Sequence, residues 1–123
     1  MERDLDLIKS ILLKMEDTLP GTVYNSEDFV IDGHEADEVH FHMWLLKESR
    51  LIEGFDVSTM GNVGPQIIPT RITMTGYDFL QATKNESIWN KAKESLTAAG
   101  GGASLDIVKT LLTKLTIEGL GLS

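Results

Sequence analysis

The spacing of the apolar residues changes at residue 51, and this change restricts the folds open to the chain. Before it, over about residues 34–49, apolar residues recur at helical spacing, at Ala36, Val39, Met43 and Leu46. After it, residues 51–57 and 66–73 predict two strands, because the segment between them carries the turn signals Gly61-Asn62 and Gly64-Pro65. Two strands so close in sequence predict a β-hairpin directly after a helix.

The predicted sheet is small and irregular. Pro69 lies inside the second strand and has no backbone N–H to donate, so we expect an edge position or a bulge there. A further short strand is predicted at Phe29-Val30-Ile31, which is bounded by Asp28 and Asp32-Gly33. The sheet is therefore expected to have two or three antiparallel strands.

Helices are predicted on both sides of this region. The first covers about residues 3–17 and has the apolar stripe Leu5, Ile8, Leu12 and Met15. Another follows the hairpin, capped by Thr73 or Thr75, and turns Tyr77, Phe79 and Leu80 inward. Asn85-Glu86-Ser87 marks a break, after which a helix continues to about residue 99.

The last helix is predicted over residues 104–117. Three successive glycines, 100–102, interrupt the preceding helix, and Ser104 then caps the new one. Its apolar stripe is Leu105, Val108, Leu111, Leu112 and Leu115. This stripe either closes the core of the same domain or packs against a second copy, and we favour a homodimer because two-fold dimers are the commonest oligomers.

Two stretches around the hairpin resemble winged-helix proteins. Leu45 to Gly54 (LLKESRLIEG) is similar to the segment in which the third helix of a winged helix ends and enters the wing. Ile72 to Leu80 (ITMTGYDFL) resembles the segment that follows the wing in regulators of the MarR and PadR types. Arg50 stands where the first pattern has glycine, and this predicts a less tight helix end.

Other stretches are more specific. The start Arg3 to Ile8, the segment Val39-x-x-His42, Ile88 to Lys91 and the tail 101–122 resemble a bacterial and phage-associated winged-helix family of unknown function. A more distant similarity is to the YjcQ family. This resemblance implies a small intracellular protein of the kind often carried by prophages, and it implies no stated activity.

The expected fold is therefore α+β: a winged-helix-like domain of helices and a small antiparallel sheet, with C-terminal helices. We expect this domain over residues 1–99, a glycine-rich linker at 100–103, and at 104–123 a helix of the same domain or a dimerisation element. One departure is that residues 22–33 offer no convincing positioning helix, which a helix-turn-helix requires.

Charge is distributed unevenly along the chain. The 123 residues contain 11 Lys and Arg, 19 Asp and Glu, and no cysteine, for a net charge of −8. Residues 1–56 hold fourteen acids and five bases, so the whole negative excess lies in the first half. The absence of cysteine excludes disulfides, thiolate zinc sites and cysteine nucleophiles. The acidic excess indicates either an acidic functional face or a solvated surface.

The helix before the hairpin carries the candidate partner-binding residues. Its acids are Glu35, Asp37, Glu38 and Glu48, and its aromatic residues Phe41 and Trp44 lie off the apolar stripe. These aromatic side chains either form an exposed patch for a partner or are covered by the wing or the last helix. We predict a non-enzymatic regulatory or interaction module of phage or prophage type that acts through protein contacts. One form of this prediction is an inhibitor whose acidic face imitates DNA toward a nucleic-acid-binding protein.

The alternative is a winged-helix transcriptional regulator that binds DNA. Its contacts would be Lys47 and Arg50 at the end of the helix and Arg71 on the wing. Strong DNA binders neutralise roughly six to ten phosphates, and these three cations fall short of that number.

No catalytic, metal or cofactor site is predicted. His34, His40 and His42 lie near carboxylates, and Glu38 with His42 occupies one helical face, yet no third ligand is evident. We expect instead that His42 is packed and hydrogen-bonded and that the other two histidines lie at the surface. The apolar runs are too short to span a bilayer and the start is acidic, so we expect a cytoplasmic protein without membrane association.

Overall fold

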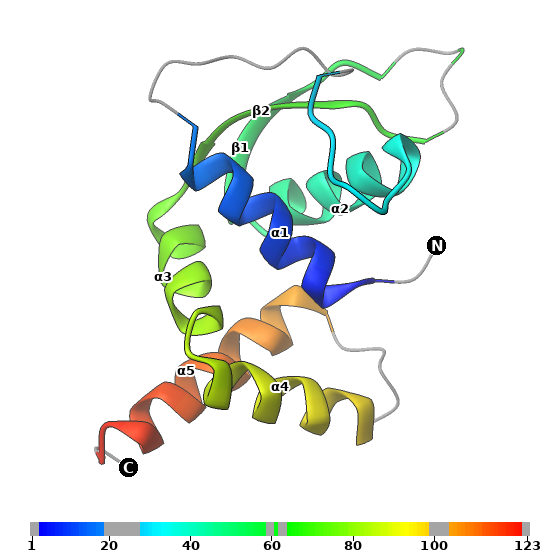
Figure 1. Cartoon of the computed structure of the whole chain (residues 1–123). Helices are drawn as coiled ribbons and strands as arrows, with labels where there is room; N and C mark the ends of the chain where they lie inside the picture. Colours follow the sequence, from blue (N-terminus) through cyan, green and yellow to red (C-terminus); the bar gives the residue numbers. More distant parts are fainter. Residues whose placement is uncertain (1–2, 19–27, 59–60, 62–63, 99–103, 122–123) are drawn as a thin grey trace. The chain divides into compact units, whose positions relative to one another are not determined.

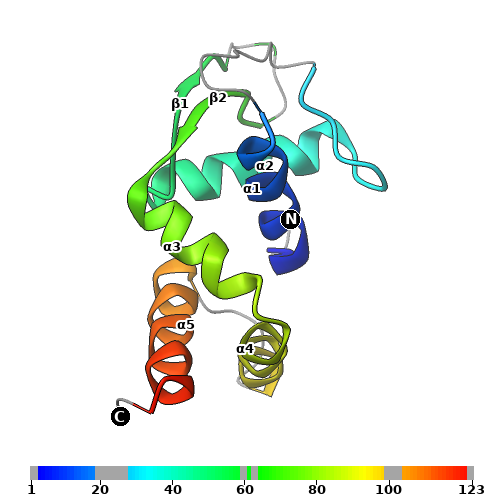
Figure 2. The ribbon, with the colours of Figure 1, turned by 60° about the vertical axis from the view of Figure 1, so that its left-hand side comes forward.

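The computed structural model in Figures 1 and 2 describes residues 3–18, 28–58, 61, 64–98 and 104–121. Over these residues it contains five α-helices and one two-stranded antiparallel sheet. The elements in chain order are α1 (Leu5–Glu16), α2 (Ala36–Glu48), β1 (Ile52–Asp56), β2 (Ile67–Ile72), α3 (Met74–Thr83), α4 (Glu86–Ala98) and α5 (Leu105–Gly119). The predicted α+β class is confirmed, and the arrangement is consistent with a small winged-helix-like domain with C-terminal helices.

The chain divides into two compact units, Met1–Gly76 and Tyr77–Ser123. The first unit holds α1, α2, the hairpin and the first turn of α3, and the second holds the remainder of α3 with α4 and α5. The division falls inside α3, earlier than residue 99, where we expected the winged-helix-like part to end. The predicted linker at 100–103 lies outside the described residues.

In the first unit, α1 starts at an aspartate cap and packs against α2 and β2. The Asp4 carboxylate accepts a hydrogen bond from the Leu7 N–H at 3.1 Å, which satisfies a donor at the helix start. The buried residues of α1 are Leu7, Ile8, Ile11 and Leu12. The stripe is therefore rotated slightly from the prediction, because Leu5 and Met15 are only half-buried.

The strand predicted at residues 29–31 is wrong. These residues form no strand, and the sheet over the described residues consists of β1 and β2 alone. The physical reason lies in Lys14 of α1, whose ammonium group donates to the Val30 carbonyl and sits 5.1 Å from the centre of the Phe29 ring. The Lys14 side chain thus binds a carbonyl group that would accept a hydrogen bond from a neighbouring strand if residues 29–31 were part of the sheet. Phe29 itself is buried.

The hairpin confirms the irregularity predicted at the proline. Glu53 pairs with Arg71, but the next residue, Gly54, pairs with Pro69, so Thr70 is an extra residue in β2. Such an extra residue is a β-bulge, which bends the strand and re-aims the neighbouring side chains.

The end of α2 is closed by a Schellman motif with Arg50 at the left-handed position, φ +61°. The Leu51 N–H donates to the Leu46 carbonyl and the Arg50 N–H donates to the Lys47 carbonyl, both at 3.0 Å. The expectation of a less tight helix end is therefore wrong, because arginine adopts the backbone conformation that glycine usually supplies.

The turn from β2 into α3 is held by Thr73, as predicted. Its hydroxyl accepts a hydrogen bond from the Gly76 N–H at 3.0 Å and lies 2.7 Å from the Arg50 carbonyl oxygen. Gly76 approaches the preceding corner so closely that a Cβ there would lie 1.9 Å from the Leu51 carbonyl oxygen. The start of α3 therefore packs directly against the residues that follow α2. There is no room for a side chain at Gly76.

In the second unit, α3 buries Phe79, Leu80 and Thr83. Tyr77, predicted to face inward, is 50% exposed. Gly76, Phe79, Leu80 and Thr83 are buried and recur at positions i, i+3, i+4 and i+7, so they form one face of the helix. Tyr77 lies one position after Gly76, and its side chain therefore falls outside this face.

The last two helices contact each other, and the cap predicted at Ser104 and the break predicted at residues 85–87 are confirmed. Asn85 accepts from the Ile88 N–H at 3.1 Å, and Ser104 accepts from the Ile107 N–H at 3.3 Å. The buried residues of α4 are Trp89, Ala92 and Leu96, and those of α5 are Leu105, Val108 and Leu112. Over the part of the chain that the structure describes, no helix combines the length and apolar character needed to cross a bilayer.

Candidate functional site

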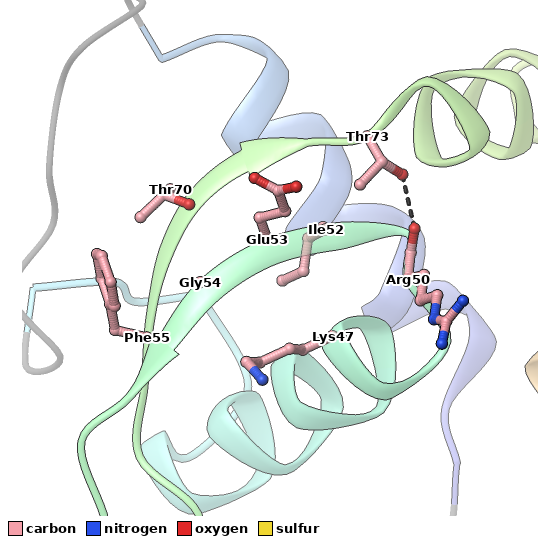
Figure 3. A pocket seen from close by; sticks show the side chains of 8 residues that line it. All are labelled: Lys47, Arg50, Ile52, Glu53, Gly54, Phe55, Thr70 and Thr73. Carbon is pink, nitrogen blue, oxygen red and sulfur yellow. Dashed lines mark hydrogen bonds between the residues drawn. The ribbon is translucent and has the colours of Figure 1, made fainter.

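A surface pocket of about 460 Å³ lies at the corner between α2 and the hairpin (Figure 3). It is lined by Lys47, Arg50, Ile52, Glu53, Gly54, Phe55, Thr70 and Thr73. The last turn of α2 supplies the lysine, the Schellman motif supplies the arginine, and the bulge supplies Thr70. The pocket therefore brings together two of the three cations that the sequence suggested for DNA contact.

Arg50 occupies its place in the pocket at a conformational cost. A left-handed residue other than glycine costs roughly 1–2 kcal/mol, and helix ends of this type usually carry glycine instead. Strained residues of this kind occur preferentially at functional sites, where the side chain rather than the backbone is needed. The conformation of Arg50 therefore marks its side chain as a candidate functional group.

The third cation, Arg71, is neutralised by a neighbour. Its Nε and a terminal nitrogen bind the two carboxylate oxygens of Glu53 at 2.7 and 2.8 Å. The hydrogen bond from Arg71 holds the pKa of Glu53 below its usual value, and the same contact raises the pKa of Arg71. Arg71, which was predicted to contact DNA, is thus paired with a carboxylate on the neighbouring strand. The same pairing leaves Glu53 with little free negative charge.

One further carboxylate lies close to the pocket. Hydrogen bonds from the side chain and the backbone N–H of Ser58 lower the pKa of Asp56, and the positive charge of Lys47 lowers it further. Asp56 is fully exposed, so water screens its attraction for Lys47.

The acidic residues of the α2 region lie mainly in solvent. Glu35, Asp37 and Glu48 are exposed, whereas Glu38 is half-buried and pairs with the ring Nδ1 of His34. Glu35 precedes the helix without capping it through its side chain, and Asp37 lies in the first turn, where the helix dipole favours acids. Three of the four predicted carboxylates are thus free to meet a partner.

The aromatic residues Phe41 and Trp44 form no fully exposed patch. Both are half-buried, with ring centroids 6.1 Å apart, and Phe41 also meets the edge of His42. The exposed aromatic side chain of this region is instead Phe55 on β1, which is 65% exposed. The sequence analysis missed Phe55, although its alternation with Glu53 on a predicted strand places the two on one face.

The histidines serve the packing of α2. His42 is buried, its Nε2 accepts from the Asp4 N–H at 2.8 Å, and its Nδ1 donates to the Glu38 carbonyl at 2.7 Å. The prediction for His42 is therefore confirmed. His40, expected at the surface, is also buried and accepts from the Ile67 N–H at 3.0 Å. That expectation was wrong because His40 turns toward β2.

The described histidines and carboxylates form no metal-binding cluster. Among the described residues, no three histidine, aspartate or glutamate side chains are placed to hold one ion. His42 has both ring nitrogens engaged with the backbone, so it has no free nitrogen to offer a metal.

The residues predicted for dimerisation are mostly used within the chain. Leu105, Val108 and Leu112 are buried in the single chain, on a helix that packs against α4. Leu111 and Leu115 are half-buried and flank this stripe. A second copy could therefore reach only the flank of α5, because the centre of the predicted stripe is already covered.

Comparison with known proteins assigns the chain to a family. A family model described as "Hypothetical protein (DUF2513)" matches residues 2–103. The chain belongs to this family. A relative described as "Uncharacterized protein" from Haemophilus influenzae is 31% identical over 109 residues, which cover 89% of this chain and 90% of that protein. No solved structure matches the chain.

The predicted resemblance to a family of unknown function is thereby confirmed. Two of the stretches on which that resemblance rested meet in the structure, since the backbone N–H of Asp4, in the starting stretch, donates to His42 of the Val39-x-x-His42 segment. This bond joins the start of α1 to α2, so these two stretches describe a packing contact in the DUF2513 protein.

Proposed function

We propose that this DUF2513 protein is a non-enzymatic regulatory module that acts through protein contacts, with the α2 region as its docking face. The observation that carries the proposal is the exposure of three acids of the α2 region, Asp37 and Glu48 on the helix and Glu35 directly before it. A winged helix that reads DNA presents cations there, because the phosphate backbone supplies most of the affinity. Carboxylates at this position repel DNA and attract a basic protein.

The hairpin supports the same proposal. Its Arg71 is bound to Glu53 by two hydrogen bonds, so the strand adds little free positive charge to this face. We propose a partner with a basic, nucleic-acid-binding surface, for which the carboxylates take the place of phosphates. Such complementarity steers association and fixes partner choice more than it raises affinity. Phe41 and Trp44, half-buried between the acids, supply apolar contact.

The proposal places the protein among cytoplasmic regulators of phage or prophage type. This part rests on the resemblance of the sequence to winged-helix proteins of that kind, which is an analogy of fold and carries no activity of its own.

The test is capture followed by displacement. The wild-type protein is immobilised, exposed to a bacterial lysate, and washed with excess duplex DNA. The proposal expects at least one captured protein that duplex DNA releases. The triple charge reversal E35K/D37K/E48K should lose this capture, because it inverts the docking face.

A matched control reverses three exposed acids of the second unit, D78K/E94K/E118K, and should retain capture. Equal capture by both triple variants would contradict the assigned face. Binding of the wild-type protein itself to random duplex DNA at low salt, with a steep loss on adding salt, would contradict the whole proposal.

A DNA-binding regulator is the second candidate, and the pocket is the observation that favours it. Lys47 and Arg50 both line it where the helix meets the hairpin, so each could contact a phosphate of the same DNA strand. In that case K47A/R50A would abolish duplex binding and reduce its salt dependence. A homodimer would double the number of these cations.

A further inference from the structure

The two edges of the hairpin are not equally protected. On β2, the outward N–H of Ile67 is bound by the His40 ring at 3.0 Å. Pro69 has no N–H to donate, and Thr70 is an extra residue that breaks the spacing of the strand. Proteins protect sheet edges by such means, because an unprotected edge can pair with a strand of another chain. The strand β1 has no proline and no extra residue, so its edge is the one open to pairing.

The backbone groups at the β1 edge follow from the hydrogen bonds at the two ends of the strand. At one end, the Val57 N–H donates to the Gln66 carbonyl at 2.9 Å. At the other end, the Leu51 carbonyl accepts from the Thr73 N–H at 3.0 Å. Because these directions alternate along a strand, the odd-numbered residues of β1 face β2 and the even-numbered residues face away from it. The outward residues are Ile52, Gly54 and Asp56. The outward backbone groups of the last two bond to no other described residue.

Open space adjoins this edge. The pocket of about 460 Å³ borders β1 at Ile52 and Gly54, and Lys47 of α2 lines it as well. In Figure 3, Glu53 and Ile52 point to opposite sides of β1, and the last turn of α2 lies on the Ile52 side. The edge between these two sides is thus free for a strand to approach in the plane of the sheet.

The outer side of the hairpin, on which Glu53 lies, carries exposed apolar side chains. Phe55 is 65% exposed and Val57 is 38% exposed, and both share this side because alternate residues of a strand point the same way. Ile68, which pairs with Phe55 on β2, is half-buried. An added strand with an apolar side chain opposite Phe55 would cover this surface.

We propose that β1 pairs with β1 of a second copy of this chain, antiparallel and with Phe55 opposite Phe55 of that copy. Gly54 then faces Asp56 of the second copy, and each such pair exchanges backbone hydrogen bonds through its outward groups. The two phenyl rings meet in the non-hydrogen-bonded position, where side chains of antiparallel strands are closest. Aromatic pairs in this position stabilise a sheet.

Charge complementarity supports a second copy as the occupant, although each chain has a net charge of −8. Lys47 lies close enough to Asp56 of its own chain for the two charges to attract. In the proposed register, Asp56 of the second copy lies opposite Gly54, which borders the same pocket as Lys47. Each lysine is then next to carboxylates from both chains. The other carboxylate of β1, Glu53, is already paired with Arg71 across the hairpin.

The same contact limits the assembly to two chains. The pairing is two-fold, so each β1 edge is used once and the contact closes on itself. Both outer edges of the resulting four-stranded sheet are β2, which the bulge and Pro69 protect. We therefore expect a dimer and no larger species. The contact involves neither Glu35 nor Asp37, so it is expected whether or not these bind a protein partner.

The first experiment measures the mass of the full chain by sedimentation equilibrium up to about 1 mM, because interfaces of this size form weak complexes. The wild type should pass from monomer to dimer as its concentration rises. Phe55→Lys places like charges opposite each other and should raise the dissociation constant at least about tenfold. Because Phe55 is exposed in the single chain, this variant should unfold near the wild-type temperature at low concentration. Ile107→Lys, on the exposed side of α5, is the matched control and should dimerise as the wild type does.

The second experiment tests the register. The chain has no cysteine, so a single cysteine introduced at Phe55 can form a disulfide only with a second copy. Opposed residues in the non-hydrogen-bonded position have Cα atoms about 4.5 Å apart, a separation that a disulfide can span. In oxidised glutathione, Phe55→Cys should therefore form a linked dimer at least about tenfold faster than either of two controls. The controls are Glu53→Cys, which the register places opposite Val57, and Thr70→Cys on β2.

Several outcomes would overturn the proposal. A chain that stays monomeric up to about 1 mM would do so, as would a dimer that Phe55→Lys leaves unchanged. Loss of the dimer in Ile107→Lys alone would place the contact on α5 instead. Faster linkage by either control cysteine than by Phe55→Cys would contradict the register, and species larger than a dimer would contradict the closed pairing.

Discussion

Helices α2 and α5 end in the same way but with different residues, and the difference separates what the fold needs from what it tolerates. In α2 the left-handed residue is Arg50, whose N–H bonds to the Lys47 carbonyl at 3.0 Å. In α5 it is Gly121, with φ +75°, whose N–H bonds to the Glu118 carbonyl at 3.0 Å. The same backbone geometry is thus reached with glycine in one helix and, at a cost, with arginine in the other.

The buried faces of the two helices differ as well. That of α5 consists of Leu105, Val108 and Leu112, which pack by shape alone. That of α2 includes His40 and His42, whose ring nitrogens bind backbone groups of β2 and α1. Apolar packing tolerates small shifts, whereas these hydrogen bonds require one alignment. The position of α2 relative to β2 and α1, in the unit that carries the pocket, is therefore fixed more precisely than apolar packing alone would fix it.

The largest expected effect tests the apolar face of α5. Leu112→Ala should lower the free energy of unfolding by about 2–5 kcal/mol, because it leaves a cavity in a fully buried site. Chemical denaturation monitored by circular dichroism measures the change. Ile107→Ala on the exposed side of the same helix should cost under about 0.5 kcal/mol. Equal losses in the two variants would show that α5 is not packed as described.

The next effect tests the polar face of α2. His42→Leu keeps the apolar volume but leaves the Asp4 N–H without its acceptor, so it should cost about 1–3 kcal/mol. Amide hydrogen exchange at Asp4 should accelerate together with the loss measured by denaturation. A variant as stable as the wild type would break the comparison, since the histidine would then be replaceable by packing alone.

At the C-terminal end of α2, we expect a substitution that raises the free energy of unfolding, in contrast to the two losses above. Arg50→Gly should raise the free energy of unfolding by about 0.5–1 kcal/mol, because glycine avoids the left-handed penalty yet loses more entropy on folding. Gly121→Arg should lower it by a similar or smaller amount, since it lies at the end of its helix. Thermal unfolding of both variants measures these shifts, and a loss of stability in Arg50→Gly would show that the arginine side chain supports the fold.

The smallest effect concerns the ion pair across the hairpin. Arg71 lowers the pKa of Glu53, so the stabilisation that this carboxylate contributes is present above its unfolded pKa and is lost as the pH falls through the folded value. Arg71→Gln should therefore raise the pKa of Glu53 toward its usual value, as followed by carbon NMR of the carboxylate.

Much of the fold could be predicted because its signals are local. The change of period at residue 51, the cap at Ser104 and the bulge beside Pro69 each depend on residues adjacent in the chain, and all three are present. The strand at residues 29–31 could not be excluded in this way. These residues instead contact α1, where Lys14 donates to the Val30 carbonyl, and no local pattern carries that contact.

The candidate site was foreseen only in part, for a related reason. Lys47 and Arg50 stood out as rare cations in an acidic region, and the structure places both in one pocket. The neutralisation of Arg71 by Glu53 depends on strand register, and the exposure of Phe55 depends on which face of the hairpin meets the core. Neither property can be derived before the strands are paired.

The bulge in β2 has a consequence for molecules that meet in solution. A two-stranded sheet has two edges, and a regular edge can recruit the strand of another chain. Thr70 breaks the even spacing of β2, and Pro69 beside it offers no N–H, so an incoming strand would find its ladder interrupted midway. The irregularity that shapes one side of the pocket thus also protects the β2 edge of the hairpin from pairing with a strand of another molecule.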